Sequence, residues 1–281
     1  MIPRSIETAT SIAAAAYCNR NGYISKLVPF GGKASPATVA GNIEHEYFEH
    51  YLKLAKLECT SMTKLISNKL HKQRKNRLYG FVENIIITSH PEFGELCRET
   101  LESLDYRIDI FFTNLINNAE DILRTHNYQI VKKLIFPWKI EEPFYNQELG
   151  INAKADLIYQ TIGNSLVVVD IKSHKSLLPA FMHRDSHYAQ MVIYSILAEA
   201  KFNLPCNDCK IFYSQDLTYE NYTIPDSDKE QVINLRNQMR HYLENPIPPV
   251  LTDTEKFKCD FCYNKKSCDE LVISMEGHAK L

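Results

Sequence analysis

One stretch of six residues decides the fold, Val167–Lys172, with the sequence VVVDIK. It overlaps the run Ser165–Ile171, whose β-branched residues are typical of a buried central strand. Because side chains alternate faces along a strand, Asp170 and Lys172 should point to one face and Ile171 to the other. A carboxylate and an ammonium group placed in this way can share a site. The alternative is a surface ion pair, because a D-x-K triplet on a strand is common.

A second carboxylate should lie beside this strand. Asp156 belongs to a similar apolar-flanked stretch, and a turn at Gly163-Asn164 would make the two strands neighbours. Two close carboxylates repel each other unless one is protonated or a cation lies between them. Their oxygen atoms suit Mg²⁺ or Mn²⁺, which can polarise a phosphoryl oxygen and lower the pKa of a bound water. Lys172 would orient that water or help to deprotonate it.

The flanking sequence predicts an α/β fold, with a sheet flanked by helices. Residues 5–58 look helical, with a second helix from Ala37 to Leu57, and residues 60–127 look mostly helical. Extended segments are then expected at Tyr128–Trp138, Glu141–Glu148, Ala153–Gln160 and Lys210–Ser214. Later helices are expected at Asp185–Phe202 and from a cap at Asp226 or Ser227 to about Glu244.

Composition places the chain among ordinary globular proteins. Its 281 residues are 44% hydrophobic and 23% charged, which excludes disorder as the main state. With 32 basic and 34 acidic residues the net charge is -2, so any nucleic-acid binding must come from a local patch. No apolar run approaches the length of a membrane span, and Ser11–Tyr17 is too short for a signal peptide. We therefore expect an intracellular, cytoplasmic protein that is not membrane-bound.

Three further residues could complete a site around the D-x-K strand. Gln190 and Tyr194 are four residues apart on an expected helix, so they share a face that can lie over this strand. His45 follows Gly41 by four residues in the segment GNIEHEYFEH. A lone histidine is more often structural than a ligand, so the value of His45 comes from the combination.

This combination resembles the RecB-like branch of the PD-(D/E)xK nuclease superfamily. Within it, the sequence is most similar to the CRISPR-associated Cas-four exonucleases and to the nuclease domain of the replication helicase-nuclease. The motifs follow the family's order, from an N-terminal cysteine and G-x-x-x-H through an aspartate, D-x-K and Q-x-x-x-Y to C-x2-C-x5-C. Here they are Cys18, His45, Asp156, Asp170 with Lys172, Gln190 with Tyr194, and Cys259, Cys262 and Cys268. Two departures are Ala155 in place of the superfamily's proline, and a long gap between His45 and Asp156.

The resemblance implies a restriction-endonuclease-like core, with a central mixed β-sheet flanked by helices. It also implies four segments: N-terminal helices (1–58), a helical insertion (59–127), the nuclease core (128–245) and a C-terminal cysteine segment (246–281). By the same resemblance, Lys172 would be the catalytic lysine, and Gln190 and Tyr194 would steer DNA or support the site. The metal ligands would be Asp156, Asp170, His45 and the carbonyl group of Ile171.

Clustered cysteines in a reducing compartment more often hold metal than form disulfides. Cys259, Cys262 and Cys268 are one thiolate short of a closed site. The pair Cys206 and Cys209 could complete a zinc ribbon-like set, although 49 residues separate this pair from the cluster. The family resemblance instead brings in Cys18 and implies a [4Fe-4S] cluster held by four cysteines. The isolated Cys59 and Cys97 are expected to be small buried apolar residues.

A local basic patch is expected at Lys64–Arg77, which carries six basic residues and no acidic one. In a candidate nuclease this run could bind DNA phosphates, and the DNA-binding candidates in it are Lys69, Lys72, Arg74 and Lys75. The alternative is a solvated helix face.

The predicted function is a metal-dependent DNA exonuclease that acts preferentially on single-stranded ends and carries an iron-sulfur cluster. The family implies a role in CRISPR spacer acquisition, with CRISPR adaptation proteins as partners, or in DNA repair. The alternative is a non-catalytic DNA- or protein-binding adaptor with the same fold and a zinc or iron-sulfur structural site. Intact Asp156, Asp170 and Lys172 argue against the adaptor.

Overall fold

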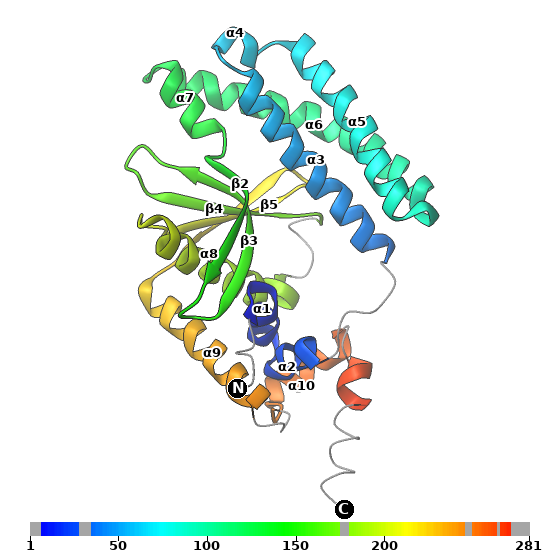
Figure 1. The fold of residues 1–281 in the computed structure, drawn as a ribbon, viewed down its shortest axis with the longest axis vertical. Coiled ribbons are helices and arrows are strands. Elements are labelled where there is room, and N and C mark those ends of the chain that lie inside the picture. Colours follow the sequence, from blue (N-terminus) through cyan, green and yellow to red (C-terminus); the bar gives the residue numbers. More distant parts are fainter. Residues whose placement is uncertain (1–6, 28–34, 175–179, 245–248, 263–264, 271–281) are drawn as a thin grey trace, which may run out of the picture.

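A central β-sheet with helices on both faces forms the body of the protein in a computed structural model (Figure 1). The structure describes residues 7–27, 35–174, 180–244, 249–262 and 265–270. Within these residues, six strands form one mixed sheet in the order β1-β3-β4-β5-β6, and β2 pairs with β3. The strands are β1 (Glu7–Thr8), β2 (Lys139–Asn146), β3 (Ile151–Gln160), β4 (Leu166–Lys172), β5 (Asp208–Tyr213) and β6 (Thr218–Thr223). The α/β class predicted from the sequence is confirmed.

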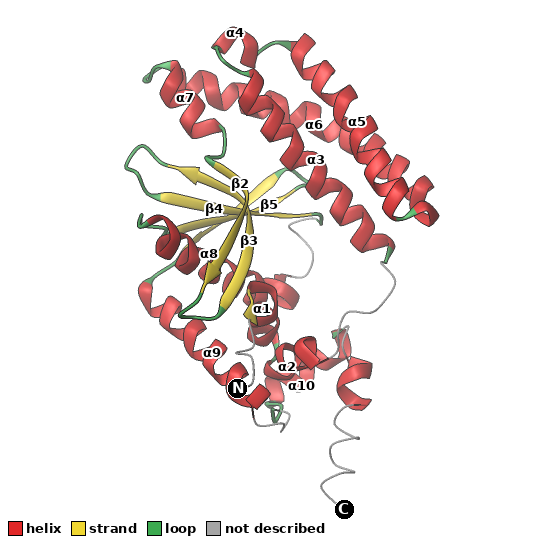
Figure 2. Ribbon diagram, in the orientation of Figure 1, coloured by secondary structure: helices red, strands yellow, loops and turns green. Residues whose placement is uncertain are grey.

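Each face of the sheet has its own hydrophobic core and its own helices (Figure 2). One core lies under α3 (Pro36–Glu58), α4 (Met62–Leu65), α5 (Asn68–Ser89), α6 (Gly94–Leu123) and α7 (Tyr128–Ile135). The other lies under α1 (Ala9–Tyr17), α8 (Ala180–Phe202) and α9 (Asp226–Glu244). Beyond α1 are α2 (Asn19–Leu27) and α10 (Asp253–Lys258), and the short 3₁₀ turns are η1 (Pro91–Phe93) and η2 (Cys259–Phe261).

Strand β4 shows the side-chain alternation that its sequence predicts. Val169 and Ile171 pack into the core under α3 and α6, whereas Leu166 and Val168 pack into the core under α8. The predicted turn is also present, because Asn164 has a φ of 60° and β3 pairs antiparallel with β4. The two strands are therefore neighbours, as expected.

The long helix α3 carries the G-x-x-x-H motif, and it begins with a strong local signal. The side chain of Ser35 accepts a hydrogen bond from the N–H of Thr38, and Pro36 occupies the first turn, where its missing N–H costs nothing. Val39, Ile43 and Tyr47 then repeat one turn apart and are fully buried. The expected helix Ala37–Leu57 is confirmed.

One predicted strand is wrong, and two strands were missed. Most of the segment Tyr128–Trp138 forms helix α7, because the side chain of Asn127 caps the N–H groups of Gln129 and Ile130. Val131 and Ile135 then bury one side of this helix at a spacing of four residues. The missed strands are β1, which has two residues, and β6, whose sequence TYENYT lacks an apolar run.

The sheet opens at Asp156, and this opening positions the site. On one edge of β3, β1 pairs at residues 151–152 and β4 pairs from Leu157 onward. Between them, described residues 153–156 have no ladder partner on that edge. On the other edge, Glu141 opposite Asp156 has a φ of 54° and is also left out of the ladder. Strand β4 therefore diverges from β3 here.

Candidate active site

The two predicted carboxylates meet where β3 and β4 diverge. Asp156 and Asp170 are only 5% and 3% exposed. Where the next ladder bond would be, the Asp156 Oδ2 atom accepts a hydrogen bond of 2.7 Å from the backbone N–H of Ile171. The side chain of Asp156 thus takes over the pairing that its backbone lacks. Burial raises the pKa of Asp170; Lys172 opposes this shift and Asp156 adds to it.

The D-x-K motif and the Q-x-x-x-Y motif form one connected network. Lys172 Nζ lies 2.7 Å from Asp170 Oδ2 and donates a hydrogen bond of 3.0 Å to Gln190 Oε1. The amide of Gln190 donates in turn to Asp170 Oδ1 at 3.2 Å and to the Tyr194 hydroxyl at 2.9 Å. The predicted shared face of Asp170 and Lys172 is confirmed, and α8 places Gln190 and Tyr194 directly beside it.

His45 reaches the same place from α3. Its Nε2 atom lies 2.9 Å from Asp156 Oδ2, and its Nδ1 atom lies 3.1 Å from Glu49 Oε1. Burial by itself lowers the pKa of His45, but the contacts with Asp156 and Glu49 outweigh it and raise the pKa to about 10. One ligand atom from each of these three residues lies within 4.8 Å of the others, which is close enough for a single metal ion.

An open cleft of about 360 Å³ exposes this cluster. Its lining includes His45, Asp156, Asp170 and Lys172 together with Gly41 of the G-x-x-x-H motif. A Cβ atom added at Gly41 would come within 2.7 Å of Ser173 Oγ. Gly41 therefore lets α3 approach the residues that follow the D-x-K motif, which explains the small residue in this position of the motif.

A second layer of buried polar groups fixes Lys172. Glu44 accepts a hydrogen bond from the hydroxyl of Ser214 and another, of 2.9 Å, from Arg107 of α6. The N–H of Ser214 donates to the carbonyl of Lys172 at 2.9 Å, and Arg107 donates to the carbonyl of Ser214 at 2.8 Å. This network ties α3, α6 and the end of β5 to the backbone of the D-x-K motif.

Four of the cysteines line one small cavity at the far end of the molecule. Cys18 follows α1 as its C-cap, Cys259 begins the turn η2, Cys262 follows that turn, and Cys268 lies in a helical segment at 265–270. The cavity that these four cysteines share measures about 30 Å³. Burial raises the pKa of the Cys18 and Cys268 thiols.

Polar contacts join the two chain ends around this cavity. Lys258 Nζ donates to the carbonyl of Tyr17 at 2.7 Å, and the N–H of Asn19 donates to Glu255 Oε1 at 2.9 Å. The other four cysteines lie elsewhere, fully buried in the two cores: Cys59, Cys97, Cys206 and Cys209. The prediction that Cys59 and Cys97 are buried apolar residues is confirmed.

Residues 2–161 match the family model of the DNA replication factor Dna2, which is more than half of the chain. The chain belongs to the Dna2 family. It is also similar to the "DNA replication ATP-dependent helicase/nuclease dna2" of Schizosaccharomyces pombe, with 23% identity over 281 residues. That match covers 95% of this chain but 18% of the relative, so the chain spans less than a fifth of the relative's length. The predicted resemblance to RecB-like nucleases is thereby confirmed at the level of the Dna2 family.

The part of the chain that matches the Dna2 model ends just after β3. It includes His45 and Asp156, whereas Asp170, Lys172 and Gln190 lie beyond it. The structure brings all five together, so the cleft joins the matched and unmatched parts of the chain. The closer resemblance to the Cas-four exonucleases stays a prediction.

Sequence reasoning missed Glu49, the fully buried carboxylate behind His45. The signal was present, because Glu49 follows His45 by four residues on a helix and so shares its face. Burial raises the pKa of Glu49, and His45 opposes the shift. The roles of Glu44, Ser214 and Arg107 could not be found in this way, because their contacts join segments far apart in the sequence.

The predicted DNA-binding run on α5 needs a correction. Lys69 and Lys72 are exposed, but Arg74 is 0% and Lys75 8% exposed. Lys75 pairs with Asp105 and Asp109 of α6 at 2.9 and 2.8 Å. Arg74 lies 5.1 Å from the centre of the Tyr51 ring and 3.6 Å from Glu58. Buried and paired side chains of this kind do not face phosphates, so the prediction is wrong for Arg74 and Lys75.

No helix in the described part of the chain is long and apolar enough to cross a membrane.

Proposed function

We propose that this chain is a metal-dependent deoxyribonuclease that hydrolyses phosphodiester bonds in the cleft between α3, β4 and α8. The observation that carries the proposal is the convergence of Asp156, Asp170, Lys172 and His45 on one open cleft. Membership of the Dna2 family supports DNA as the substrate. A non-catalytic adaptor would have no use for a half-buried lysine held between Asp170 and Gln190, close to the second buried carboxylate of Asp156.

The donor atoms in the cleft fit a divalent ion such as Mg²⁺ or Mn²⁺. Asp156 and Asp170 offer carboxylate oxygens, and we propose that His45 and the carbonyl of Ile171 complete the ligand set. Glu49 lies close enough to His45 to join this set or to orient the imidazole. When bound, the ion supplies a Lewis acid and lowers the pKa of a coordinated water.

The side chains in the cleft would have different roles in the reaction. With a pKa of about 10, His45 is protonated on both ring nitrogens, one facing Asp156 and the other facing Glu49. It must therefore lose one proton before that nitrogen can act as a metal ligand. The ammonium group of Lys172 lies in the cleft at 2.7 Å from Asp170 and would orient the attacking water by donating a hydrogen bond to it. Gln190 holds both of these side chains in place. Gln190 and Tyr194 thus support the site and border the path of the DNA.

The finer proposal is exonuclease activity on single-stranded ends. It is tested with oligonucleotides labelled at the 5′ or 3′ end, and with circular single strands, in the presence of Mg²⁺ or Mn²⁺. Linear strands should be shortened progressively, circles should resist, and Lys172→Ala should abolish cleavage while DNA binding persists. Binding without any metal-dependent cleavage by the wild-type protein would favour the adaptor. Because the family model describes a replication factor, we favour DNA processing in replication or repair, and a CRISPR role stays a prediction.

We also propose a [4Fe-4S] cluster between Cys18, Cys259, Cys262 and Cys268. The support is that these four cysteines line one cavity, between the end of α1 and the C-terminal segment. Such a cluster would stabilise the joint between α1 and the C-terminal segment.

Protein purified without oxygen should be brown and contain about four irons per chain. Cys18→Ser should remove the colour and destabilise the protein, whereas Cys206→Ser, in the core of the sheet, should keep the colour. Colourless protein with one zinc per chain, unchanged by Cys18→Ser, would contradict the cluster.

A further inference from the structure

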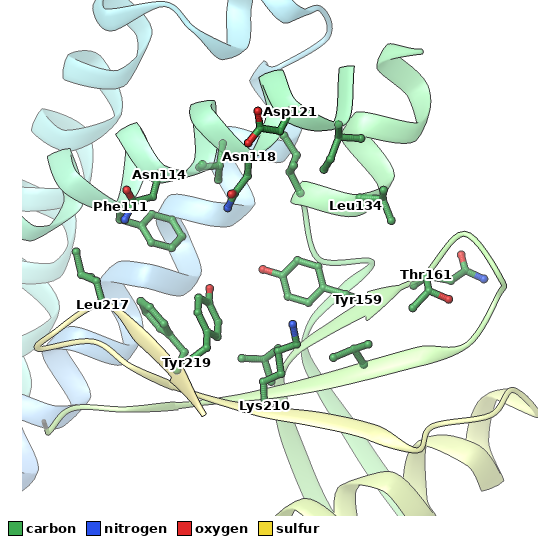
Figure 3. Close-up of a pocket in the computed structure, with 17 residues that line it drawn as sticks. Phe111, Asn114, Asn118, Asp121, Leu134, Tyr159, Thr161, Lys210, Leu217 and Tyr219 are labelled. Carbon is green, nitrogen blue, oxygen red and sulfur yellow. The ribbon is translucent and has the colours of Figure 1, made fainter. Parts of the chain in front are cut away.

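A further cavity lies on the side of β4 opposite the active-site cleft, between the sheet and the helices α6 and α7 (Figure 3). Its volume is about 520 Å³, within the range of about 300–1,000 Å³ that small-molecule sites occupy. Val167 and Val169 of β4 line this cavity, whereas Asp170 and Lys172 line the active-site cleft. The two share no lining residue, so the cavity is a separate site.

Aromatic rings from four different elements form its walls. They are Phe111 of α6, Tyr159 of β3, Phe212 of β5 and Tyr219 of β6. The rings of Phe212 and Tyr219 lie 4.9 Å apart, and Tyr219 keeps 47% of its surface exposed at the cavity. Such flat faces bind the π-face of any nucleobase.

Within the described residues, three polar side chains that line the cavity make no side-chain hydrogen bond or ion pair: Lys210, Asn114 and Asn118. Lys210 Nζ lies 6.0 Å from the centre of the Tyr219 ring, and the described residues provide no carboxylate within ion-pair distance of it. Asn114 and Asn118, one turn apart on α6, make no side-chain hydrogen bond within the same part of the chain. The one acidic lining residue, Asp121, lies on the side opposite Lys210 in Figure 3 and pairs with Arg124 at 3.5 Å.

We propose that this cavity binds a nucleotide. The base would lie against the aromatic walls, its polar edge would face the amides of Asn114 and Asn118, and its phosphate would lie near Lys210. An amide offers both a donor and an acceptor, which matches the mixed edges of bases. Unpaired Lys210 supplies the cation for a phosphate. An apolar side chain of a partner protein would fill the aromatic walls but would leave the lysine and both amides without a use.

The nucleotide has two sources with the same chemistry, a unit of a bound single strand or a free mononucleotide. The test uses the full chain without divalent metal and titrates it with dAMP by calorimetry. We expect saturable binding of one dAMP per chain, weakened about tenfold or more by Tyr219→Ala or by Lys210→Ala. Deoxyadenosine, which lacks the phosphate, should respond to Tyr219→Ala but not to Lys210→Ala. The matched controls Tyr106→Ala and Lys266→Ala, at exposed positions outside the cavity, should leave dAMP affinity unchanged.

Because Tyr219→Ala could disturb β6, a blocking variant gives an independent test. Asn118 is exposed on α6, so Asn118→Trp adds a ring at the mouth of the cavity without removing a core contact. It should abolish dAMP binding while the circular dichroism spectrum is retained. If a strand supplies the nucleotide, Asn118→Trp also weakens binding of a single-stranded oligonucleotide; if the ligand is a free mononucleotide, only dAMP binding falls.

No saturable dAMP binding by the wild-type protein, or binding that survives Asn118→Trp, would overturn the proposal. Either result would leave the nuclease proposal intact, because Lys172→Ala tests that site separately. Lys172→Ala should retain dAMP binding.

Discussion

Two histidines of this protein are each paired with an aspartate, yet their surroundings shift their pKa values in opposite directions. In the cleft, His45 lies between the carboxylates of Asp156 and Glu49, and its pKa rises to about 10. In the layer formed by helices α3 to α7, here called the helical layer, His71 lies 2.6 Å from Asp109, but burial lowers the pKa of His71. An aspartate beside a histidine therefore does not by itself mark an active site.

The remaining neighbours of His71 explain the difference. Its Nδ1 atom lies 2.9 Å from the Tyr51 hydroxyl, and a neutral imidazole that donates from Nε2 to Asp109 can accept a hydrogen bond at this position. The ring stacks on Phe112 at 4.0 Å, and Lys75 already neutralises Asp109 at 2.8 Å. His71 is thus a neutral hydrogen-bond bridge in a closed helical layer.

The cleft has the opposite balance. Asp156 and Glu49 both contact His45, and Asp156 also lines the open cleft of about 360 Å³ together with Asp170. Two nearly buried carboxylates at the wall of an open cleft favour a bound cation, because the cation relieves the repulsion between Asp156 and Asp170. The imidazolium of His45 serves this purpose in the metal-free protein.

The largest expected effect is on cleavage, from Asp170→Asn. It should reduce the rate of strand cleavage by about 10³-fold or more, since a ligand to the proposed ion is lost. Asp109→Asn, the matched change beside His71, should leave the cleavage rate per folded molecule unchanged. A similar loss of cleavage in both variants would erase the distinction between the two regions.

Stability gives the same variant a second readout. The raised pKa of Asp170 means that the folded state disfavours its ionised form, so neutralising it should leave the metal-free protein at least as stable as wild type. Mn²⁺ should raise the melting temperature of the wild type by mass action, and Asp170→Asn should lose most of that rise. If Asp170→Asn unfolds the metal-free protein, Asp170 is a structural ion-pair partner of Lys172.

The next effect concerns pH and His45. Because its folded-state pKa is raised from 6.5 to about 10, protonated His45 stabilises the fold fully below pH 6.5, and this contribution is lost as the pH rises toward 10. Each pKa unit corresponds to about 1.4 kcal/mol, so the metal-free protein should lose about 2–4 kcal/mol of unfolding free energy across this range. His45→Gln should flatten the profile in urea denaturation, whereas His71→Gln should not. Equal slopes for wild type and His45→Gln would refute the charged histidine.

The sequence predicted the residues of the candidate site better than it predicted the helices packed around the sheet. Strand alternation placed Asp170 and Lys172 on one face, and the turn at Asn164 placed Asp156 beside them, because both are local rules of the backbone. The basic run on α5 misled, since the partners that bury Arg74 and Lys75 lie on other elements. Segment Tyr128–Trp138 was predicted as a strand because of its β-branched residues, but the cap at Asn127 favours a helix there.

A smaller effect on stability is expected in the helical layer. His71→Ala removes the acceptor of the buried Tyr51 hydroxyl and the ring that stacks on Phe112, which should cost about 2–3 kcal/mol of unfolding free energy. Cleavage per folded molecule should stay at the wild-type level. Loss of cleavage in a protein of normal stability would show that this layer, too, contributes to the reaction.

The smallest expected effect is on DNA binding by α5, where exposed and buried cations lie side by side. Lys69 and Lys72 face solvent, so Lys69→Ala with Lys72→Ala should weaken single-strand binding several-fold in about 0.1 M salt. If both lysines contact phosphates, the slope of log affinity against log salt should become shallower by about 1.4, because fewer counterions are released. Arg74→Met is the matched control, because Arg74 is fully buried and does not face phosphates. Removing one partner of a buried ion pair costs stability, so DNA binding is compared per folded molecule. On that basis Arg74→Met should leave both affinity and slope unchanged. If the double variant binds with an unaltered slope, the exposed lysines of α5 are a solvated face and the DNA path lies elsewhere around the cleft.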